Sequence, residues 1–352
     1  MNINEKYIQR CLDLAENGLG NTYPNPLVGA VVVHNNKIIG EGWHQQAGKA
    51  HAEVNAIAQV QDESFLKDAT IYVNLEPCSH FGKTPPCSDL IIAKGIKKVV
   101  IGMLDPFEKV AGRGIKKLLN AGCQVKVGVL EDKCKELNKR FLTYHLQKRP
   151  YIILKWATSQ DGFLSPYQFP EIPENPAPVW ITGSQSKQLV HKWRSQEQAI
   201  LVGANTVLAD QPSLTTRLWK GKNPTRIILD PDLKLNTNAK VFNAEAKNIW
   251  IHDQGLQNNS QENYVSEGIN FQENTLAELM QVLHKHEIQS LIVEGGAITL
   301  NAFIQANLWD EARVFKGKSI FQKGTPAPTL PNKKIREEKL IDTDQLKIYK
   351  ND

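Results

Sequence analysis

The sequence has no run of 18 apolar residues, and its first ten residues contain no apolar segment typical of an export signal. Both absences argue against membrane spanning and export, so we expect a cytoplasmic protein without a membrane partner. Cysteine is scarce, and its odd number of five fits a reducing compartment better than a disulfide framework. No long Lys/Arg run accompanies the net charge of +5, so the composition does not indicate a nucleic-acid partner.

The chain is longer than one ordinary hydrophobic core requires, and its 352 residues suggest two domains. A hydrophobic content of 41% and a charged content of 22% are typical of a globular protein. Residues 146–150 interrupt a helical pattern and precede an apolar strand that begins at Tyr151. We therefore expect domains at 1–148 and 149–352.

Helix-like and strand-like segments alternate along both halves, which indicates an α/β fold. In the first half we expect helices at 4–17, 113–121 and 131–147, a hairpin over 28–43, and strands at 70–75, 97–103 and 123–129. In the second half we expect a helix that ends near Arg194 and strands at 198–203, 224–230, 247–252 and 289–293.

Four residues of the first half have the types that a catalytic zinc site uses. His51, Cys78 and Cys87 offer an imidazole and two thiolates, which leave the fourth position of a tetrahedral Zn²⁺ open for water. Glu53 is the candidate proton carrier. Side chains two apart diverge in mid-helix, so His51 and Glu53 can share a site only at a helix end. The apolar positions that follow predict a helix beginning near Ala50, which meets this condition.

Other interpretations of these residues are open. Two cysteines and a histidine can be buried small side chains, or they can form a structural zinc site completed by His80 or another ligand. The His-Ala-Glu and Pro-Cys pairs, placed before a helix and after a strand, favour the catalytic interpretation.

The zinc-deaminase signature is H-x-E followed by P-C-x-x-C, with Glu as the proton shuttle. Here eight residues separate Cys78 from Cys87, and the segment 76–87 resembles the deaminase half of the bifunctional riboflavin-biosynthesis pyrimidine deaminase/reductase family. The resemblance implies a cytidine-deaminase-like domain. It also implies that substrate is contacted by Asn25, His44, His80, Lys83 and Thr84, the last three in the loop between the cysteines.

The second half is similar to the reductase half of that family, which is related to dihydrofolate reductase. The similarity lies in residues 151–162, in 203–217 and in the Gly295-Gly296 pair that follows a strand. It implies a catalytic role for Lys155, with Asp210 also near the reacting centre. It further implies cofactor contacts from Thr158, Trp180, Thr206, Asp210, Gly296, Ala297, Ile298 and Thr299, and substrate contacts from Arg194, Leu214, Arg217 and Glu294. The family's hydroxyl before Trp180 is missing, because prolines stand at 176 and 178.

The resemblance implies two reactions, with Zn²⁺ and NADPH as cofactors. The first is hydrolytic deamination of 2,5-diamino-6-(5-phosphoribosylamino)pyrimidin-4-one, a phosphorylated pyrimidine. The second is reduction of 5-amino-6-(5-phosphoribosylamino)uracil to the ribitylamino product. Two rivals stay open: a tRNA or nucleoside deaminase with an appended binding domain, and a non-catalytic zinc module fused to a pseudo-reductase. The oligomeric state is also open, with a homo-oligomer as one option.

Overall fold

The computed structural model describes the chain except for residues 1, 80–84, 107–111, 169–176, 331–332 and 352. The chain divides into two compact units, residues 1–147 and 148–352. Each unit is described by itself. Within the described residues, no helix is both long enough and apolar enough to cross a membrane.

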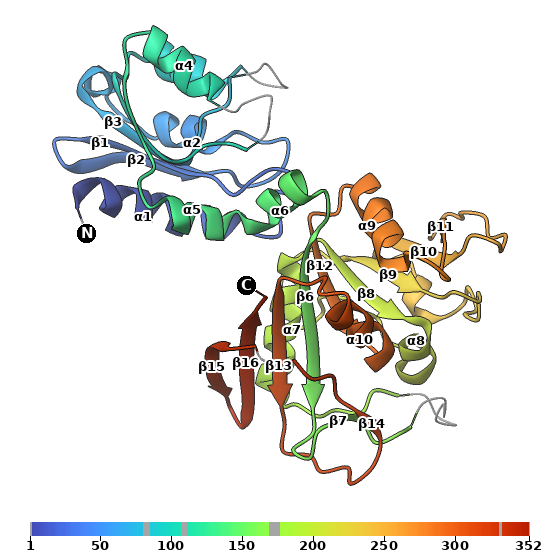
Figure 1. Cartoon of the computed structure of the whole chain (residues 1–352). Coiled ribbons are helices and arrows are strands. Elements are labelled where there is room, and N and C mark those ends of the chain that lie inside the picture. Colours follow the sequence, from blue (N-terminus) through green and yellow to red (C-terminus); the bar gives the residue numbers. More distant parts are fainter. Residues whose placement is uncertain (1, 80–84, 107–111, 169–176, 331–332, 352) are drawn as a thin grey trace. The chain divides into compact units, whose positions relative to one another are not determined.

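The first unit contains one five-stranded sheet flanked by helices (Figure 1). Its helices are α1 (Ile3–Ala15), α2 (Ala52–Ala58), α3 (Cys87–Ala93), α4 (Arg113–Asn120), α5 (Glu131–Leu137) and α6 (Lys139–Gln147). Its strands are β1 (Gly29–His34), β2 (Lys37–Trp43), β3 (Thr70–Leu75), β4 (Lys98–Met103) and β5 (Gln124–Val127). Short 3₁₀ turns, η1 (Glu16–Gly18) and η2 (Glu63–Asp68), complete this unit.

The strand order of this sheet is β2-β1-β3-β4-β5, with β3, β4 and β5 parallel and β1 antiparallel to both neighbours. Side chains alternate between two cores because successive residues of a strand face opposite sides. Ala30 and Val32 belong to the core that also contains residues of α2, α3 and α4, whereas Val31 and Val33 belong to the core that contains residues of α1 and α5. Burial on both faces explains why β1 reads as a continuous apolar run.

The helix expected over 131–147 is wrong in one respect, because it is two helices, α5 and α6, separated at Asn138. The buried Asn138 side chain accepts a hydrogen bond from the backbone N–H of Leu27 at 2.8 Å and donates one to its carbonyl at 3.0 Å. Asn74 donates to the same carbonyl, so two buried amides fix the chain near Leu27. A helical pattern in the sequence carries no information about these distant partners.

The second unit contains a nine-stranded sheet of order β11-β10-β9-β8-β12-β6-β13-β16-β15. Its strands are β6 (Tyr151–Thr158), β8 (Ala199–Gly203), β9 (Thr225–Leu229), β10 (Asn248–Asp253), β11 (Val265–Ile269), β12 (Ser290–Gly295), β13 (Glu311–Lys316), β15 (Ile335–Ile341) and β16 (Asp344–Lys350). A small ribbon pairs β7 (Phe163–Ser165) with β14 (Thr325–Pro326). The helices are α7 (Ser184–Gln196), α8 (Ala204–Asp210), α9 (Thr275–Lys285), α10 (Ala297–Gln305) and the 3₁₀ turn η3 (Lys240–Phe242).

The strands from β11 to β13 run parallel, and only β16 and β15 are antiparallel additions. Helices α9 and α10 pack on one face of the sheet through Leu279, Leu283 and Phe303. On the other face Val190 and Trp193 of α7 pack against Ile153. Since the parallel strands end at one edge, the loops there are brought together, and ligands of open α/β sheets bind at that edge.

Candidate functional sites

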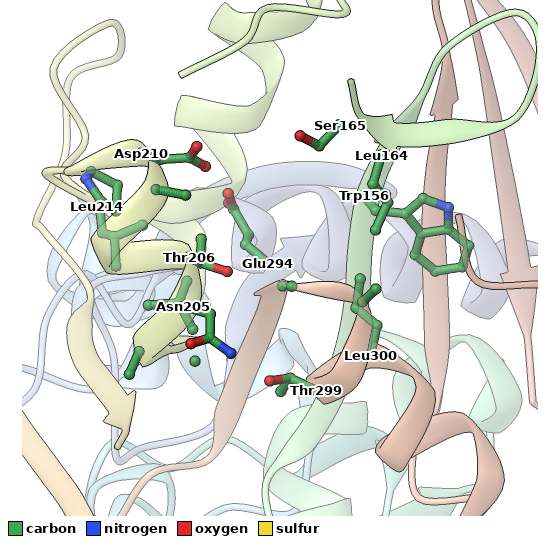
Figure 2. Close-up of a pocket in the computed structure, with 18 of the residues that line it drawn as sticks. Trp156, Leu164, Ser165, Asn205, Thr206, Asp210, Leu214, Glu294, Thr299 and Leu300 are labelled. Carbon is green, nitrogen blue, oxygen red and sulfur yellow. The ribbon is translucent and has the colours of Figure 1, made fainter. Parts of the chain in front are cut away.

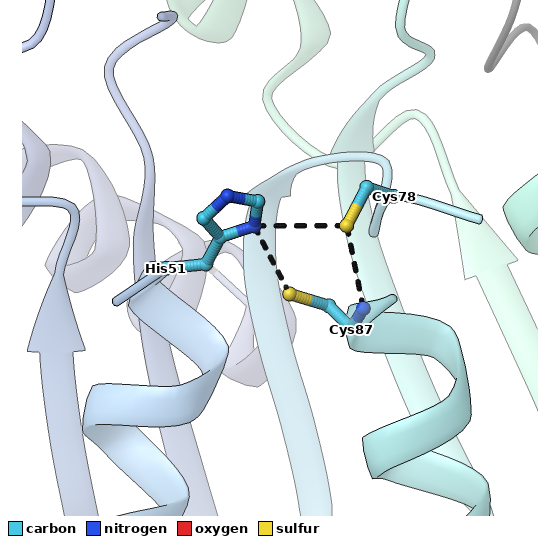
Figure 3. A group of neighbouring side chains, drawn as sticks. All are labelled: His51, Cys78 and Cys87. Carbon is cyan, nitrogen blue, oxygen red and sulfur yellow. Dashed lines mark hydrogen bonds between the residues drawn. The ribbon is translucent and has the colours of Figure 1, made fainter. Parts of the chain in front are cut away.

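His51, Cys78 and Cys87 converge in the first unit (Figure 3). The Nδ1 atom of His51 lies 3.2 Å from Sγ of Cys87 and 3.6 Å from Sγ of Cys78. The three donor atoms all lie within 4.8 Å of one another. Ligands of a tetrahedral zinc with bonds of 2.0–2.3 Å are separated by about 3.5–3.8 Å, so this donor set fits Zn²⁺.

Secondary-structure ends bring these groups together. His51 is the N-cap of α2, in an extended conformation with φ −73° and ψ 165°, while Glu53 lies in the first helical turn. Because His51 stands outside the helix, the helical divergence of side chains two apart does not apply to it. Cys78 follows β3, and Cys87 is the first residue of α3.

Burial and close contact shift the acidities of this cluster. Hydrogen bonds from Cys87 and His51 outweigh burial and lower the pKa of Cys78 to about 4. The pKa of Cys87 is raised, because its thiol donates to Cys78 and is buried. Burial raises the pKa of Glu53, which is only 3% exposed and accepts a hydrogen bond from the Cys87 thiol. Glu53 is therefore a carboxyl group shielded from water beside the triangle of zinc donors formed by His51, Cys78 and Cys87, and such a group is suited to carrying protons.

Asn25 and His44 form a hydrogen-bonded pair next to this triangle. Nδ2 of Asn25 lies 3.0 Å from Nε2 of His44, and Nδ1 of His44 lies 3.1 Å from the carbonyl of Ala50. A carbonyl only accepts, so Nδ1 of His44 carries the proton, and Nε2 accepts from the Asn25 amide. The His44 ring meets the His51 ring edge-on, with centroids 5.5 Å apart. The other expected contacts, His80, Lys83 and Thr84, lie outside the described residues.

In the second unit, a cavity of about 810 Å³ opens at the carboxyl edge of the parallel strands (Figure 2). Figure 2 shows Thr206 and Asp210 of α8 on one side, Glu294 at the end of β12 in the middle, and Thr299 of α10 below it. The volume of the cavity lies within the range of about 300–1,000 Å³ that is typical of small-molecule sites.

A buried ion-pair cluster stands in the cavity wall. Glu294 accepts two hydrogen bonds from Arg194, at 3.0 and 2.7 Å, and lies 3.7 Å from Nζ of Lys155. Burial raises the pKa of Glu294, but the charges of Arg194 and Lys155 outweigh it and lower the pKa to about 2. Burial also lowers the pKa of Lys155. The cluster therefore holds an ionised carboxylate that orients two cations.

Glycine backbone leaves room beside two hydroxyl groups of the cavity. A Cβ added at Gly296 would lie 3.2 Å from Oγ1 of Thr206, and one at Gly203 would lie 3.0 Å from Oγ1 of Thr299. Gly295 has a φ of 131°, which side chains rarely adopt. Helix α10 begins at this point, and a helix N-terminus favours a phosphate. This cradle fits the diphosphate of a dinucleotide.

The cavity brings together all but one of the residues expected at the reductase site. Those that line it are Lys155, Trp180, Arg194, Thr206, Asp210, Leu214, Arg217, Glu294, Gly296, Ala297, Ile298 and Thr299. Thr158 does not line it among the described residues. Its hydroxyl instead donates to the carbonyl of Ser159. Pro178 and Val179 stand in the wall where the family has its hydroxyl.

The sequence analysis missed His191, which also lines the cavity and is only 4% exposed. Its Nδ1 atom has no hydrogen-bond partner among the described residues. Burial and the charges of Arg194 and Arg217 lower its pKa to about 4. The available signal was its position three residues before Arg194, which places both side chains on one face of α7.

These features define a zinc-dependent deaminase domain joined to a domain with a dinucleotide-type reductase cavity. Residues 1–103 match the cytidine and deoxycytidylate deaminase zinc-binding region, and residues 150–329 match the RibD C-terminal domain. The chain is 43% identical over 340 residues to the riboflavin biosynthesis protein RibD of Aquifex aeolicus, covering 95% of this chain and 92% of that protein. It is 36% identical to RibD of Escherichia coli, covering 98% and 95%.

Solved structures agree with this assignment. The diaminohydroxyphosphoribosylaminopyrimidine deaminase/5-amino-6-(5-phosphoribosylamino)uracil reductase of Thermotoga maritima superimposes with a TM-score of 0.85 at 35% identity, covering 99% of this chain and 98% of that one. RibD of Acinetobacter baumannii gives a TM-score of 0.85 at 33% identity, with the same coverage. The chain therefore belongs to the RibD family, the bifunctional deaminase/reductases of riboflavin biosynthesis.

Proposed function

We propose that the first unit removes an amino group by hydrolysis from 2,5-diamino-6-(5-phosphoribosylamino)pyrimidin-4-one. We propose that the second unit then reduces the ribosyl group of the product, 5-amino-6-(5-phosphoribosylamino)uracil, with NADPH. The observation that carries the proposal is that each unit holds a separate reaction centre: a zinc donor triangle beside a buried Glu53, and a cavity around the Lys155–Glu294–Arg194 cluster.

For deamination, His51, Cys78 and Cys87 would hold zinc, whose Lewis acidity makes a hydroxide nucleophile available near neutral pH. Glu53 would accept the proton of the attacking water and deliver it to the departing amine. Asn25, fixed by His44, would present its amide oxygen to the pyrimidine, because its nitrogen is engaged by the imidazole. The loop residues His80, Lys83 and Thr84 would bind the ribose phosphate.

For reduction, NADPH would supply a hydride to the ribosyl carbon, which becomes an acceptor when the ribosylamine opens to an imine. Lys155 would face that carbon and supply a proton, and Asp210 would lie nearby. Glu294 would hold Lys155 and Arg194 in place. Gly296, Ala297, Ile298, Thr299, Thr206 and Trp180 would contact the cofactor, and Arg194, Leu214 and Arg217 the substrate. Thr158, which stands apart from the cavity, is the least supported of the proposed cofactor contacts.

Two broader expectations stay predictions. None of the five cysteines is in a disulfide, and two of them would hold zinc, which supports a reducing compartment such as the cytoplasm. Assembly into a homo-oligomer is also proposed, and sedimentation of the purified chain tests it.

Incubating the full chain with the diaminopyrimidine ribotide, with and without NADPH, tests the proposal. Mass spectrometry is expected to show exchange of an amino group for oxygen in both samples, and addition of two hydrogens only with NADPH. A shift of labelled tRNA without turnover of the ribotide would favour the tRNA-deaminase rival. Zinc binding without either product would favour the non-catalytic rival.

A further inference from the structure

The reductase cavity continues beyond the catalytic cluster toward the ends of β9 and β11. Besides Glu294 at the end of β12, it is lined by residues that follow β9, among them Pro231 and Lys234, and by Phe271 and Leu276 after β11. The strand order β12-β8-β9-β10-β11 places these groups two to four strand spacings from Glu294, or about 10–19 Å. A dinucleotide that bound with its nicotinamide at Glu294 would therefore reach this distal end with its adenosine.

The distal end combines apolar side chains with two lysines. Leu229, Pro231, Phe271 and Leu276 offer surfaces for a flat base, and Lys234 and Lys240 also line this end. Both lysines are exposed, so a ligand in the cavity can reach their ammonium groups, although that of Lys234 already lies against a carboxylate.

The carboxylates at this end are already engaged. Asp230 is fully buried, and its oxygens accept hydrogen bonds from the backbone N–H groups of Lys234 and Leu235 and from Nε1 of Trp250. It therefore fixes the turn that carries Lys234. Asp232 is paired with Lys234 at 2.6 Å, with both side chains more than half exposed.

These positions bear on the choice between NADH and NADPH. A free carboxylate at the adenosine ribose hydrogen-bonds the 2′-hydroxyl of NADH, whereas cations accommodate the 2′-phosphate of NADPH. Here the carboxylate of Asp230 is turned into the protein and that of Asp232 is neutralised by Lys234, so the exposed charges at this end add up to one positive charge, that of Lys240.

We propose that Lys234 and Lys240 bind the 2′-phosphate and select NADPH over NADH, an inference that rests on the proposed reductase function. Lys234 has a second effect, because it masks the charge of Asp232, which would otherwise repel the phosphate.

Calorimetric titration of the full-length chain with NADPH, NADH, 2′,5′-ADP and 5′-ADP tests the proposal without relying on turnover. In Lys240→Ala, affinity for NADPH and 2′,5′-ADP is expected to fall roughly two- to fivefold, as for an exposed ion pair, while affinity for NADH and 5′-ADP is unchanged. In Lys234→Ala the loss is expected to be larger because Asp232 is uncovered. Asp232→Asn in that background is expected to restore part of the affinity.

Lys222→Ala is the matched control, since Lys222 is an exposed lysine of the same unit outside the cavity lining. It is expected to leave all four affinities unchanged. If the lysine variants weaken NADPH and NADH equally, or retain the wild-type preference, the inference is wrong while the reductase proposal stands. If the wild-type chain binds no nicotinamide dinucleotide, the proposed function itself fails.

Discussion

Glu53 combines almost complete burial with contact to the Cys87 thiol, and its side chain has a single proposed task. Glu53→Gln keeps the size and one hydrogen bond but cannot carry a proton. We expect deamination to slow by roughly 10²- to 10⁴-fold, while reduction of substrate that is already deaminated is nearly unchanged. Kinetics of each half-reaction, with zinc content and melting temperature as controls, measure this. An equal loss of both half-reactions at normal zinc content would point to one shared site.

Lys155 lies in the other unit and should show the opposite pattern. Lys155→Ala removes a cation from the buried cluster but leaves Glu294 its bidentate partner Arg194. Reduction is therefore expected to lose roughly 10²-fold or more, as for other general acids. Deamination is expected to be unaffected, and product analysis with each substrate separates the two. Reduction at the wild-type rate would remove Lys155 from the proposed mechanism.

Asp210 should make cofactor binding depend on pH. Burial raises its pKa to about 6, so this carboxyl group loses its negative charge in the cavity as the pH falls from about 7 to 5. NADPH is an anion, and its affinity for the wild-type chain should rise over that interval relative to Asp210→Asn. The phosphate of NADPH also titrates in this interval, but it affects the wild-type chain and Asp210→Asn equally. The ratio of their affinities at each pH therefore reports the charge of Asp210. A ratio that is constant from pH 5 to 8 would contradict the prediction.

At the scale of the element, helix α4 supports the strand end that carries Cys78. The buried carboxylate of Glu76 accepts hydrogen bonds from the backbone N–H groups of Gly112 and Gly114, at 2.9 and 3.0 Å. A Cβ at Gly114 would lie 2.1 Å from the carbonyl oxygen of Pro77. The helix therefore approaches the residue before the zinc ligand too closely for any side chain.

Gly114→Ala is accordingly expected to displace Pro77 and Cys78. Overpacking of this kind destabilises by about 1–3 kcal/mol, and we expect lower zinc affinity together with slower deamination. Competition with a chromogenic chelator measures the zinc affinity. Lys116→Ala, on an exposed position of the same helix, is the control. Unchanged zinc affinity in Gly114→Ala would show that α4 does not position Cys78.

At the scale of the whole molecule, only one of the two units should depend on metal. The described residues contain one group of His, Cys and acidic side chains close enough to hold an ion, and it lies in the first unit. We expect one zinc per chain by elemental analysis. Chelation should abolish deamination and leave reduction intact, and added zinc should restore the loss. Full deamination by the chelated, zinc-free chain would contradict the assignment.

The sequence by itself predicted the three donor residues that the structure brings together and the order of most elements. Donor types are set by the metal, so a histidine and two cysteines next to strand and helix patterns pointed to a zinc donor set, with Glu53 as the proposed proton carrier. Local periodicity likewise located β3 at residues 70–75, as observed. The reductase residues could be named only through resemblance, because glycines, threonines and single charges are common in any chain.

Tertiary structure decided what depends on contacts between distant segments. It interrupted a predicted helix at Asn138, whose partner Leu27 is 111 residues away, and it placed His191 in the cavity wall. It also brought Lys234 and Lys240 to the end of the cavity that begins at Glu294. Hydrophobic periodicity in the sequence predicts which face of a helix or strand is buried. Which other elements pack against that face depends on the order of the strands in the sheet. Strand order is set by packing of the whole sheet.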